Sequence, residues 1–303
     1  MIVLNIEREL VRVEAWGDIV SRPGFTESLD PKCHVLNSII GRYNFADKIR
    51  CGLSNCHTPH AKGYIVVTKD GRETNIGKDC GRNYFGVDFE AMSRKFDQDI
   101  ADKEGREKLW SFHFRVEEIK QKVQALRSME RGADWIYRKV KSLLETGHDV
   151  PATIVRYIAD KVKARDPVVT QEREATTTEI DRMEVERGRR LSRPQYIAEP
   201  IATIDGFEAL YQENDLRAML ILDVEEKIRL FEGVSIDSMD SAGISRWSRW
   251  VGTVDATLEQ AESVVQVGRR LLTSQNLQHF EYRLTEKDDR RSFSRFLKSL
   301  DTA

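Results

Sequence analysis

This sequence lacks long hydrophobic runs and an appreciable net charge. The absence of a long apolar run argues against a segment that spans a bilayer. The formal net charge of −2 argues against a protein that is basic overall and binds nucleic acid through its whole surface. Charged residues make up 32% of the chain and hydrophobic ones 40%, which is typical of a globular protein with much solvated helix surface. The apolar start is too short for a signal peptide, so we expect a cytoplasmic protein without membrane association.

Cysteine is absent from the last 223 of the 303 residues, because all four cysteines (Cys33, Cys51, Cys56 and Cys80) lie before residue 81. In a reducing cytosol such a group beside histidines favours metal binding. Scattered structural thiols and disulfides are the alternatives.

The most specific motif runs from Cys51 through Cys56 to His60 and is completed by Cys80. Two cysteines on one tight turn and a third at the start of a helix suit the tetrahedral coordination of zinc. We therefore predict one structural Zn²⁺ held by Cys51, Cys56, His60 and Cys80. His57 and Cys33 are the alternatives to His60.

A β-hairpin is expected inside this motif. The runs 63–68 and 72–76 flank Asp70 and Gly71, and Asp-Gly between two such runs favours a type I′ turn. The cysteines lie on both sides of this hairpin and would anchor it.

After Cys80 the apolar spacing becomes helical. One heptad-like stripe comprises Leu109, Phe112, Val116, Ile119, Val123, Leu126, Tyr137, Val140 and Leu144. It predicts a coiled-coil-like arm that forms the seam of a homo-oligomer or binds a partner; an ordinary bundle helix within one domain is the alternative. Trp247 and Trp250 share a helix face and have the composition of a protein interface, with core tryptophans as the alternative.

The expected fold class is mainly α with a small α+β zinc-binding N-terminal module, a long helical arm and a helical C-terminal body. The zinc module is assigned to residues 1–87 and the arm to 88–165. A charged connector, read as an exposed helix or hinge, covers 166–202, and the C-terminal domain covers 203–303. No sheet is expected after residue 88.

Enzymatic motifs are missing. The sequence contains no HExxH, GxGxxG or GxSxG pattern, and the glycines between Gly71 and Lys78 do not have phosphate-loop spacing. We therefore expect a protein that is not an enzyme.

The run from Cys51 to Gly86 resembles the small Cys/His modules of uncharacterised phage and prophage proteins. This resemblance covers about residues 20–95 and implies the same four ligands. A phage origin would suit a protein that binds and blocks a host defence complex, as the Gabija anti-defence proteins do. The predicted function is accordingly a non-enzymatic, oligomeric protein that binds and inhibits a host protein complex in the host cytoplasm.

Nucleic-acid binding by the zinc module is the alternative function. The candidate contacts are Arg50, Lys62, Lys69, Arg72, Lys78 and Arg82, with Tyr43, Tyr64 and Tyr84 between them. Such residues suit phosphate contact and base stacking. A solvated face over core tyrosines is the other interpretation.

Overall fold

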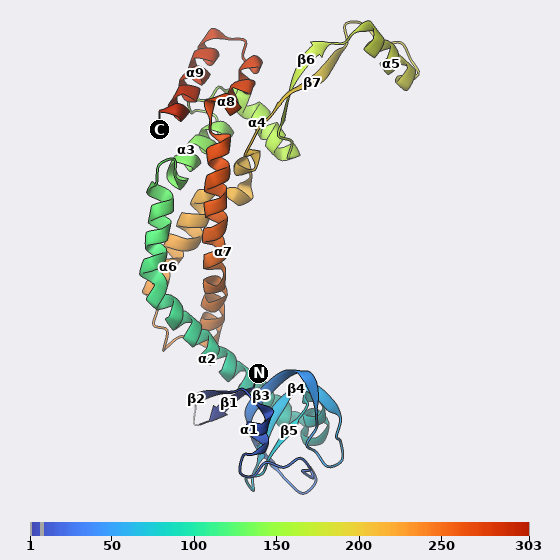
Figure 1. Cartoon of the computed structure of the whole chain (residues 1–303), viewed down its shortest axis with the longest axis vertical. Coiled ribbons are helices and arrows are strands. Elements are labelled where there is room, and N and C mark those ends of the chain that lie inside the picture. Colours follow the sequence, from blue (N-terminus) through green and yellow to red (C-terminus); the bar gives the residue numbers. More distant parts are fainter. Residues whose placement is uncertain (1, 7–8, 303) are drawn as a thin grey trace. The chain divides into compact units, whose positions relative to one another are not determined.

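The computed structural model describes residues 2–6 and 9–302 (Figure 1). It divides into unit 1, Met1–Phe112 with Ser235–Val251, and unit 2, His113–Val234 with Gly252–Ala303. Helices hold 58% of the chain and strands 19%, so the mainly α prediction is confirmed. The units differ from the four expected segments, because residues 235–251 belong with the N-terminal part and one long helix contributes to both units.

Unit 1 is built on a five-stranded antiparallel sheet. Its strands have the order β2-β1-β3-β4-β5. Their bounds are β1 Ile2–Ile6, β2 Glu9–Val13, β3 Leu36–Arg50, β4 Pro59–Thr68 and β5 Glu73–Ile76. A short helix, α1 (Trp16–Val20), follows β2, and the long helix α2 (Lys78–Ser128) follows β5.

Both faces of the sheet carry apolar clusters, because successive side chains of a strand point to opposite faces. On one face Tyr64 and Val66 of β4 pack with Phe89 and Phe96 of α2. On the other face Ile65 belongs to a separate cluster that includes Ile2, Leu4, Ile19 and Tyr43. The sheet therefore fixes the position of the strand ends from which the cysteine-bearing turns depart.

The predicted hairpin is present, but its turn is not type I′. Tyr64 pairs with Ile76 and Val67 with Glu73 in β4 and β5. The N–H of Gly71 donates to the carbonyl of Thr68 at 2.9 Å, and within this turn only Gly71 has positive φ, at 81°. Asp70 does not adopt the left-handed conformation, so the loop is a three-residue turn that ends in a glycine bulge.

The N-terminal part of α2 packs against residues 235–251, which include the start of α7 (Ser241–Leu271). Gly105 allows this close approach, because a Cβ there would lie 2.4 Å from Ile244. The rings of Phe112 and Trp250 meet edge to face at 5.1 Å, and those of Trp247 and Trp250 at 5.3 Å. The half-buried tryptophans thus contact other rings within unit 1.

Unit 2 contains the remainder of α2 and α7 and a series of shorter helices. These are α3 (Ala133–Leu144), α4 (Ala152–Ala164), α6 (Glu226–Glu232), α8 (Ser274–Leu277) and α9 (Lys287–Asp301). Three 3-10 helices, η1 (Phe207–Leu210), η2 (Gln212–Asn214) and η4 (Gln278–Arg283), and the π-helix η3 (Ala218–Glu225) connect them.

The expected 36-residue helical register is broken into two helices. α2 ends at Ser128 and α3 begins at Ala133, with Arg131 in a left-handed conformation between them. The first five stripe positions are buried within the single chain: Leu109, Phe112, Val116, Ile119 and Val123 are at most 5% exposed. The interpretation of these five residues as an oligomer seam is therefore corrected, because other residues of the same chain cover them.

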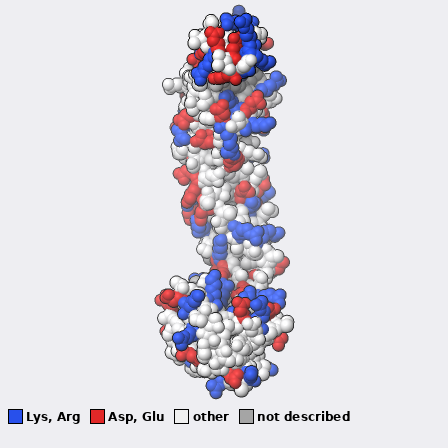
Figure 2. All heavy atoms as spheres, turned by 90° about the vertical axis from the view of Figure 1, so that its right-hand side faces the viewer, with Lys and Arg blue, Asp and Glu red and all other residues white. Residues whose placement is uncertain are grey.

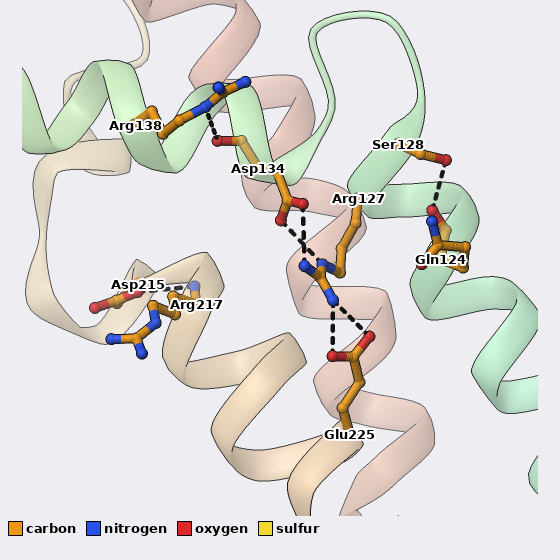
Figure 3. A network of polar contacts seen from close by, with 8 residues as sticks. All are labelled: Gln124, Arg127, Ser128, Asp134, Arg138, Asp215, Arg217 and Glu225. Carbon is orange, nitrogen blue, oxygen red and sulfur yellow. Dashed lines mark hydrogen bonds and ion pairs between the residues drawn. The ribbon is translucent and has the colours of Figure 1, made fainter.

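A polar network closes the α2–α3 turn (Figure 3). The guanidinium of Arg127 donates to both carboxylate oxygens of Asp134, at 3.0 and 3.1 Å, and to both of Glu225, at 2.8 and 2.7 Å. These hydrogen bonds raise the pKa of Arg127, with Asp134 as the largest cause. The network joins the end of α2, the start of α3 and the end of η3, and so orients α3.

The segment expected as a connector is a β-finger, which we define as residues 168–203. It consists of β6 (Val168–Glu174), α5 (Thr177–Arg187) and β7 (Tyr196–Thr203), with the two strands paired antiparallel. The expectation of no sheet after residue 88 is therefore wrong. An exposed helix was one of the two forms predicted for this segment, and α5 is such a helix.

The N-terminus of α5 carries a capping box. Glu179 hydrogen-bonds Thr176 and accepts from Arg173 at 2.7 Å. Arg173 first, and Thr176 next, lower the pKa of Glu179 from 4.5 to about 2. Because the folded value lies below the unfolded one, this cap stabilises the β-finger above about pH 4.5 and loses its effect as the pH falls towards about 2.

We predict that Arg173→Ala raises the pKa of Glu179 towards its ordinary value, because the largest stabilisation of the carboxylate is removed. An NMR titration of the Glu179 side-chain carboxyl carbon measures this shift. Arg182→Ala is the control, since Arg182 lies on α5 with Glu179 but pairs with Glu186 at 3.2 Å. An unchanged Glu179 pKa in the Arg173 variant would show that the assigned cause is wrong.

Candidate metal centre

Three cysteines converge where the sheet of unit 1 meets α2. Cys51 follows the last residue of β3, Cys56 ends the next turn, and Cys80 lies in the first turn of α2. Their sulfur atoms lie within 4.8 Å of one another. The β4–β5 hairpin thus brings Cys56 and Cys51, which lie 24 and 29 positions before Cys80, to the beginning of α2.

The three thiols are close without being bonded. The Sγ atoms of Cys56 and Cys80 are 3.3 Å apart, far longer than a disulfide bond of about 2.05 Å, and all four cysteines are free. Cys51 is 1% exposed. Cys56 and Cys80 are half-buried, which leaves the group one side that opens towards solvent.

The turn that carries Cys51 and Cys56 is held by backbone hydrogen bonds. The N–H of Cys51 donates to the carbonyl of Thr58 at 3.1 Å, and that of Cys56 to the carbonyl of Leu53 at 3.1 Å. The N–H of Gly52 donates to the carbonyl of Asn75 at 2.8 Å. Glycine is required there, because a Cβ would lie 2.1 Å from the hydroxyl of Thr74. The turn therefore packs directly on β5.

The electrostatics of the group reflect crowded thiols. Burial raises the pKa of Cys51, although the N–H groups of Leu53 and Gly77 favour its thiolate. Burial, followed by hydrogen bonding to Cys56 and repulsion from Cys51, raises the pKa of Cys80 to about 12. At Cys56 burial acts upward, but hydrogen bonding with Thr58 outweighs it and the pKa is lowered. A bound cation would stabilise all three thiolates together.

His60 lies beside this group but is not one of its close members. Among the described residues, the set with mutually close ligand atoms contains the three cysteines alone. The His60 ring packs against Gly77, where a Cβ would lie 2.8 Å from its Cδ2 atom. Its Nδ1 atom is 2.8 Å from the Tyr43 hydroxyl, whereas its buried Nε2 atom has no hydrogen-bond partner within the described part of the chain.

Tyr43 and Asn75 complete a relay behind His60. The side-chain amide of Asn75 donates to the Tyr43 hydroxyl at 3.3 Å and to the carbonyl of Arg50 at 2.8 Å. If the Nδ1–H of His60 donates to Tyr43, the lone pair of Nε2 is left for another ligand. Burial lowers the pKa of His60, which favours the neutral ring that metal coordination needs.

The residues present fit a metal ion. The three close thiols form a donor set that suits a soft metal ion. The buried Nε2 atom of His60 has no hydrogen-bond partner among the described residues, which is an unusual cost unless something binds it. The three close cysteines could thus bind a metal ion, as expected from the sequence. The alternatives lie elsewhere: Cys33 is exposed and hydrogen-bonds Asp30 at 3.4 Å, and His57 is exposed with φ at 53°.

Tyr43 and Asn75 were not recognised from the sequence as parts of this site. Tyr43 was predicted to be either a stacking residue or a core tyrosine, and Asn75 had no predicted role in the site. The residues Asn75, Ile76 and Gly77 before Cys80 offer a small sequence signal for this site. Gly77 both accommodates the His60 ring and donates its N–H to Cys51.

The six candidate nucleic-acid contacts are exposed but do not form one patch. Lys62 and Lys78 line a common cavity, whereas Arg72 pairs with Asp70 at 3.4 Å and Arg82 with Asp79 at 3.2 Å. Tyr43 and Tyr64 are 2% and 7% exposed, so they are core tyrosines and cannot stack on bases. Arg50, at the end of β3, and Lys69, in the hairpin turn, lie apart from the cavity lining. Figure 2 shows basic and acidic groups intermixed on the viewed face.

The last three positions of the predicted interface stripe are less buried than the first five. In unit 2, Tyr137, Val140 and Leu144 of α3 are half-buried and line a cavity of about 390 Å³. The same cavity is lined by Val162 of α4 and by Leu216, which follows η2. Leu126, also half-buried, lies on α2 outside this cavity.

Comparisons with known proteins found no matching family model, no matching curated protein and no matching solved structure. Over the described residues, none of the helices has the length and apolar character needed to cross a bilayer.

Proposed function

We propose that this chain is a non-enzymatic binding protein that recognises a protein partner through the apolar groove of unit 2 and whose unit 1 is stabilised by a structural zinc ion. The groove lined by Tyr137, Val140 and Leu144 is the observation that carries the proposal. In keeping with the resemblance to phage modules, the partner would belong to a host protein complex in the cytoplasm. Self-association remains a separate prediction.

Zinc would be held by the thiolates of Cys51, Cys56 and Cys80, with Nε2 of His60 as the fourth ligand. Soft sulfur donors favour zinc over magnesium or calcium. Four protein ligands would leave no open position, so the ion would supply folding free energy instead of catalysis. Tyr43 would orient the His60 ring through Nδ1, as outer partners of metal-bound histidines do.

The groove has the spacing of a helix-binding surface. Tyr137, Val140 and Leu144 stand at i, i+3 and i+7 on α3, which places them along one helix face. An amphipathic helix lays its apolar face into such a groove and anchors it with residues of the same spacing. We therefore take the occupant to be an amphipathic helix of the protein partner.

The rim of the groove carries both signs of charge. Lys141 of α3 and Glu145, the residue after α3, form an ion pair at 3.5 Å, while Lys163 and Asp215 are among the other lining residues. A partner helix that carries both acids and bases at its edges would match this rim. Rim charges fix register and orientation more than affinity.

Val140→Asp tests the proposal. We expect at least about a tenfold loss of affinity for the partner, because a buried charge would face apolar side chains at the centre of the interface. The position is only half-buried in the free chain, so its melting temperature should change little. The partner is first recovered by affinity capture and identified, and its purified form is then titrated by calorimetry.

Val185→Asp is the matched control, because Val185 is 82% exposed on the β-finger and outside the groove. Equal affinity of the wild type and the Val140 variant would refute the groove as the binding site. If light scattering instead shows a wild-type oligomer that the Val140 variant dissociates, the occupant is a second copy of the chain.

A further inference from the structure

Unit 1 contains a second cavity, which lies outside the groove and includes Tyr43 beside the metal centre. Its volume is about 420 Å³, within the usual range of small-molecule sites. β3 contributes Arg42, Tyr43 and Asn44, β4 contributes Lys62, Gly63 and Tyr64, and α2 contributes Lys78 and Asp97. Val3 of β1 completes the lining.

Three basic side chains (Arg42, Lys62 and Lys78) and one acidic side chain (Asp97) line this cavity. The carboxylate of Asp97 already has partners within the chain. Asp97 accepts a hydrogen bond from the Tyr64 hydroxyl at 2.7 Å and lies 3.8 Å from the guanidinium of Arg42. Arg42 in turn pairs with Glu104 at 3.0 Å. Arg42 is therefore engaged by two carboxylates, and these three groups together leave one net negative charge beside the cavity.

Lys62 and Lys78 are left without such compensation. Neither forms an ion pair or hydrogen bond with any residue that the structure describes. Lys62 lies on β4 two residues before Tyr64, and Lys78 begins α2 two residues after Ile76, while the hairpin pairs Tyr64 with Ile76. Two like charges that line the same cavity repel each other. An anion between them would convert this repulsion into attraction.

The cavity floor is fixed by close packing. A Cβ at Gly63 would lie 2.4 Å from the carbonyl oxygen of Ile76 and 2.5 Å from the Tyr43 hydroxyl. The backbone of β4 therefore lies directly against its neighbours at this point. Lys62 and Lys78 are thereby held on well-packed elements and not on a loose loop.

We propose that this cavity binds the phosphate group of a phosphate ester, with the ammonium groups of Lys62 and Lys78 as its two charged contacts. Lys62 and Lys78 are the two cations of the lining that no ion pair engages, and one phosphate group would contact both ammonium groups. A phosphate group has enough acceptor oxygens to be shared by two ammonium donors. The phosphate could belong to a mononucleotide or to a nucleic-acid strand, and the two sources are separated by the experiment.

The test uses the full-length, zinc-loaded chain and isothermal titration calorimetry. Adenosine monophosphate, adenosine and a 5′-phosphorylated single-stranded oligonucleotide are titrated in turn. We expect at least one of the two phosphate-bearing probes to bind and adenosine not to bind. Binding of the mononucleotide identifies a small-molecule site, whereas binding of the oligonucleotide alone identifies a nucleic-acid strand as the source.

The double variant Lys62→Gln/Lys78→Gln should weaken that binding at least about tenfold. The control is Lys69→Gln/Arg72→Gln, which removes two positive charges at the opposite end of the same hairpin, outside the cavity. This control should bind like the wild type, and zinc content and circular dichroism confirm that both variants fold. Absence of binding by both phosphate-bearing probes at millimolar concentration would overturn the proposal. Equal weakening in the two double variants would also overturn it.

Discussion

Replacing Cys51 with serine is expected to abolish zinc binding and to unfold the sheet of unit 1. Cys51 is 1% exposed, and its thiolate is the innermost of the three that converge. A structural zinc ion contributes on the order of 10 kcal/mol of apparent binding free energy, comparable to the whole stability of a domain. Metal analysis by mass spectrometry should fall from one zinc per chain to a small fraction, with loss of the sheet signals in NMR spectra.

Cys33→Ser is the matched control for this experiment. Cys33 is exposed and lies outside the cluster, so its replacement should leave one zinc per chain and an unchanged melting temperature. Wild-type protein purified with reduced thiols and without zinc would disprove the metal assignment. Loss of zinc in the Cys33 variant would instead show that the ligand set is different.

Replacing Val123 with aspartate is expected to unfold unit 2. Val123 is fully buried on α2 in a single chain, so the substitution places an unpaired charge in the core. Such a charge costs several kcal/mol, a large part of the stability of an ordinary domain. Circular dichroism should report a marked loss of helix at 25 °C. Zinc should be retained, because all its candidate ligands, Cys33 included, lie in unit 1.

The neighbouring substitution Gln124→Asp serves as the control, because Gln124 is exposed on the same helix and should tolerate the change. A folded Val123 variant that merely changes from oligomer to monomer in light scattering would contradict this prediction. In that case the stripe would be a seam between copies after all.

The sequence predicted the parts of unit 1 whose signals are local. The apolar run before Asp70 and Gly71 predicted the hairpin, although not its turn type, because both I′ and three-residue turns accept glycine at the left-handed position. Cysteine chemistry predicted which thiols converge. The choice between His60, His57 and Cys33 depended on tertiary placement, which spacing alone does not give.

The errors in the helical part have a common physical origin. The spacing of Val116, Ile119 and Val123 is the same whether the covering helix belongs to the same chain or to another copy. The β-finger was missed because both its faces are largely exposed, so β6 and β7 show no regular alternation of buried and exposed positions. Its pairing also joins residues far apart in sequence, such as Thr170 and Pro200.

Unit 1 is discontinuous in sequence, and this affects how it is made on the ribosome. Gly105 and Phe112 contact Ile244 and Trp250, which are synthesised only after the whole of His113–Val234. At ordinary translation speeds this delay is on the order of ten seconds. During that time an apolar face of α2 stays exposed to solvent in the nascent chain, where chaperones can bind it and where it can aggregate. A truncation before residue 235 would make that exposure permanent.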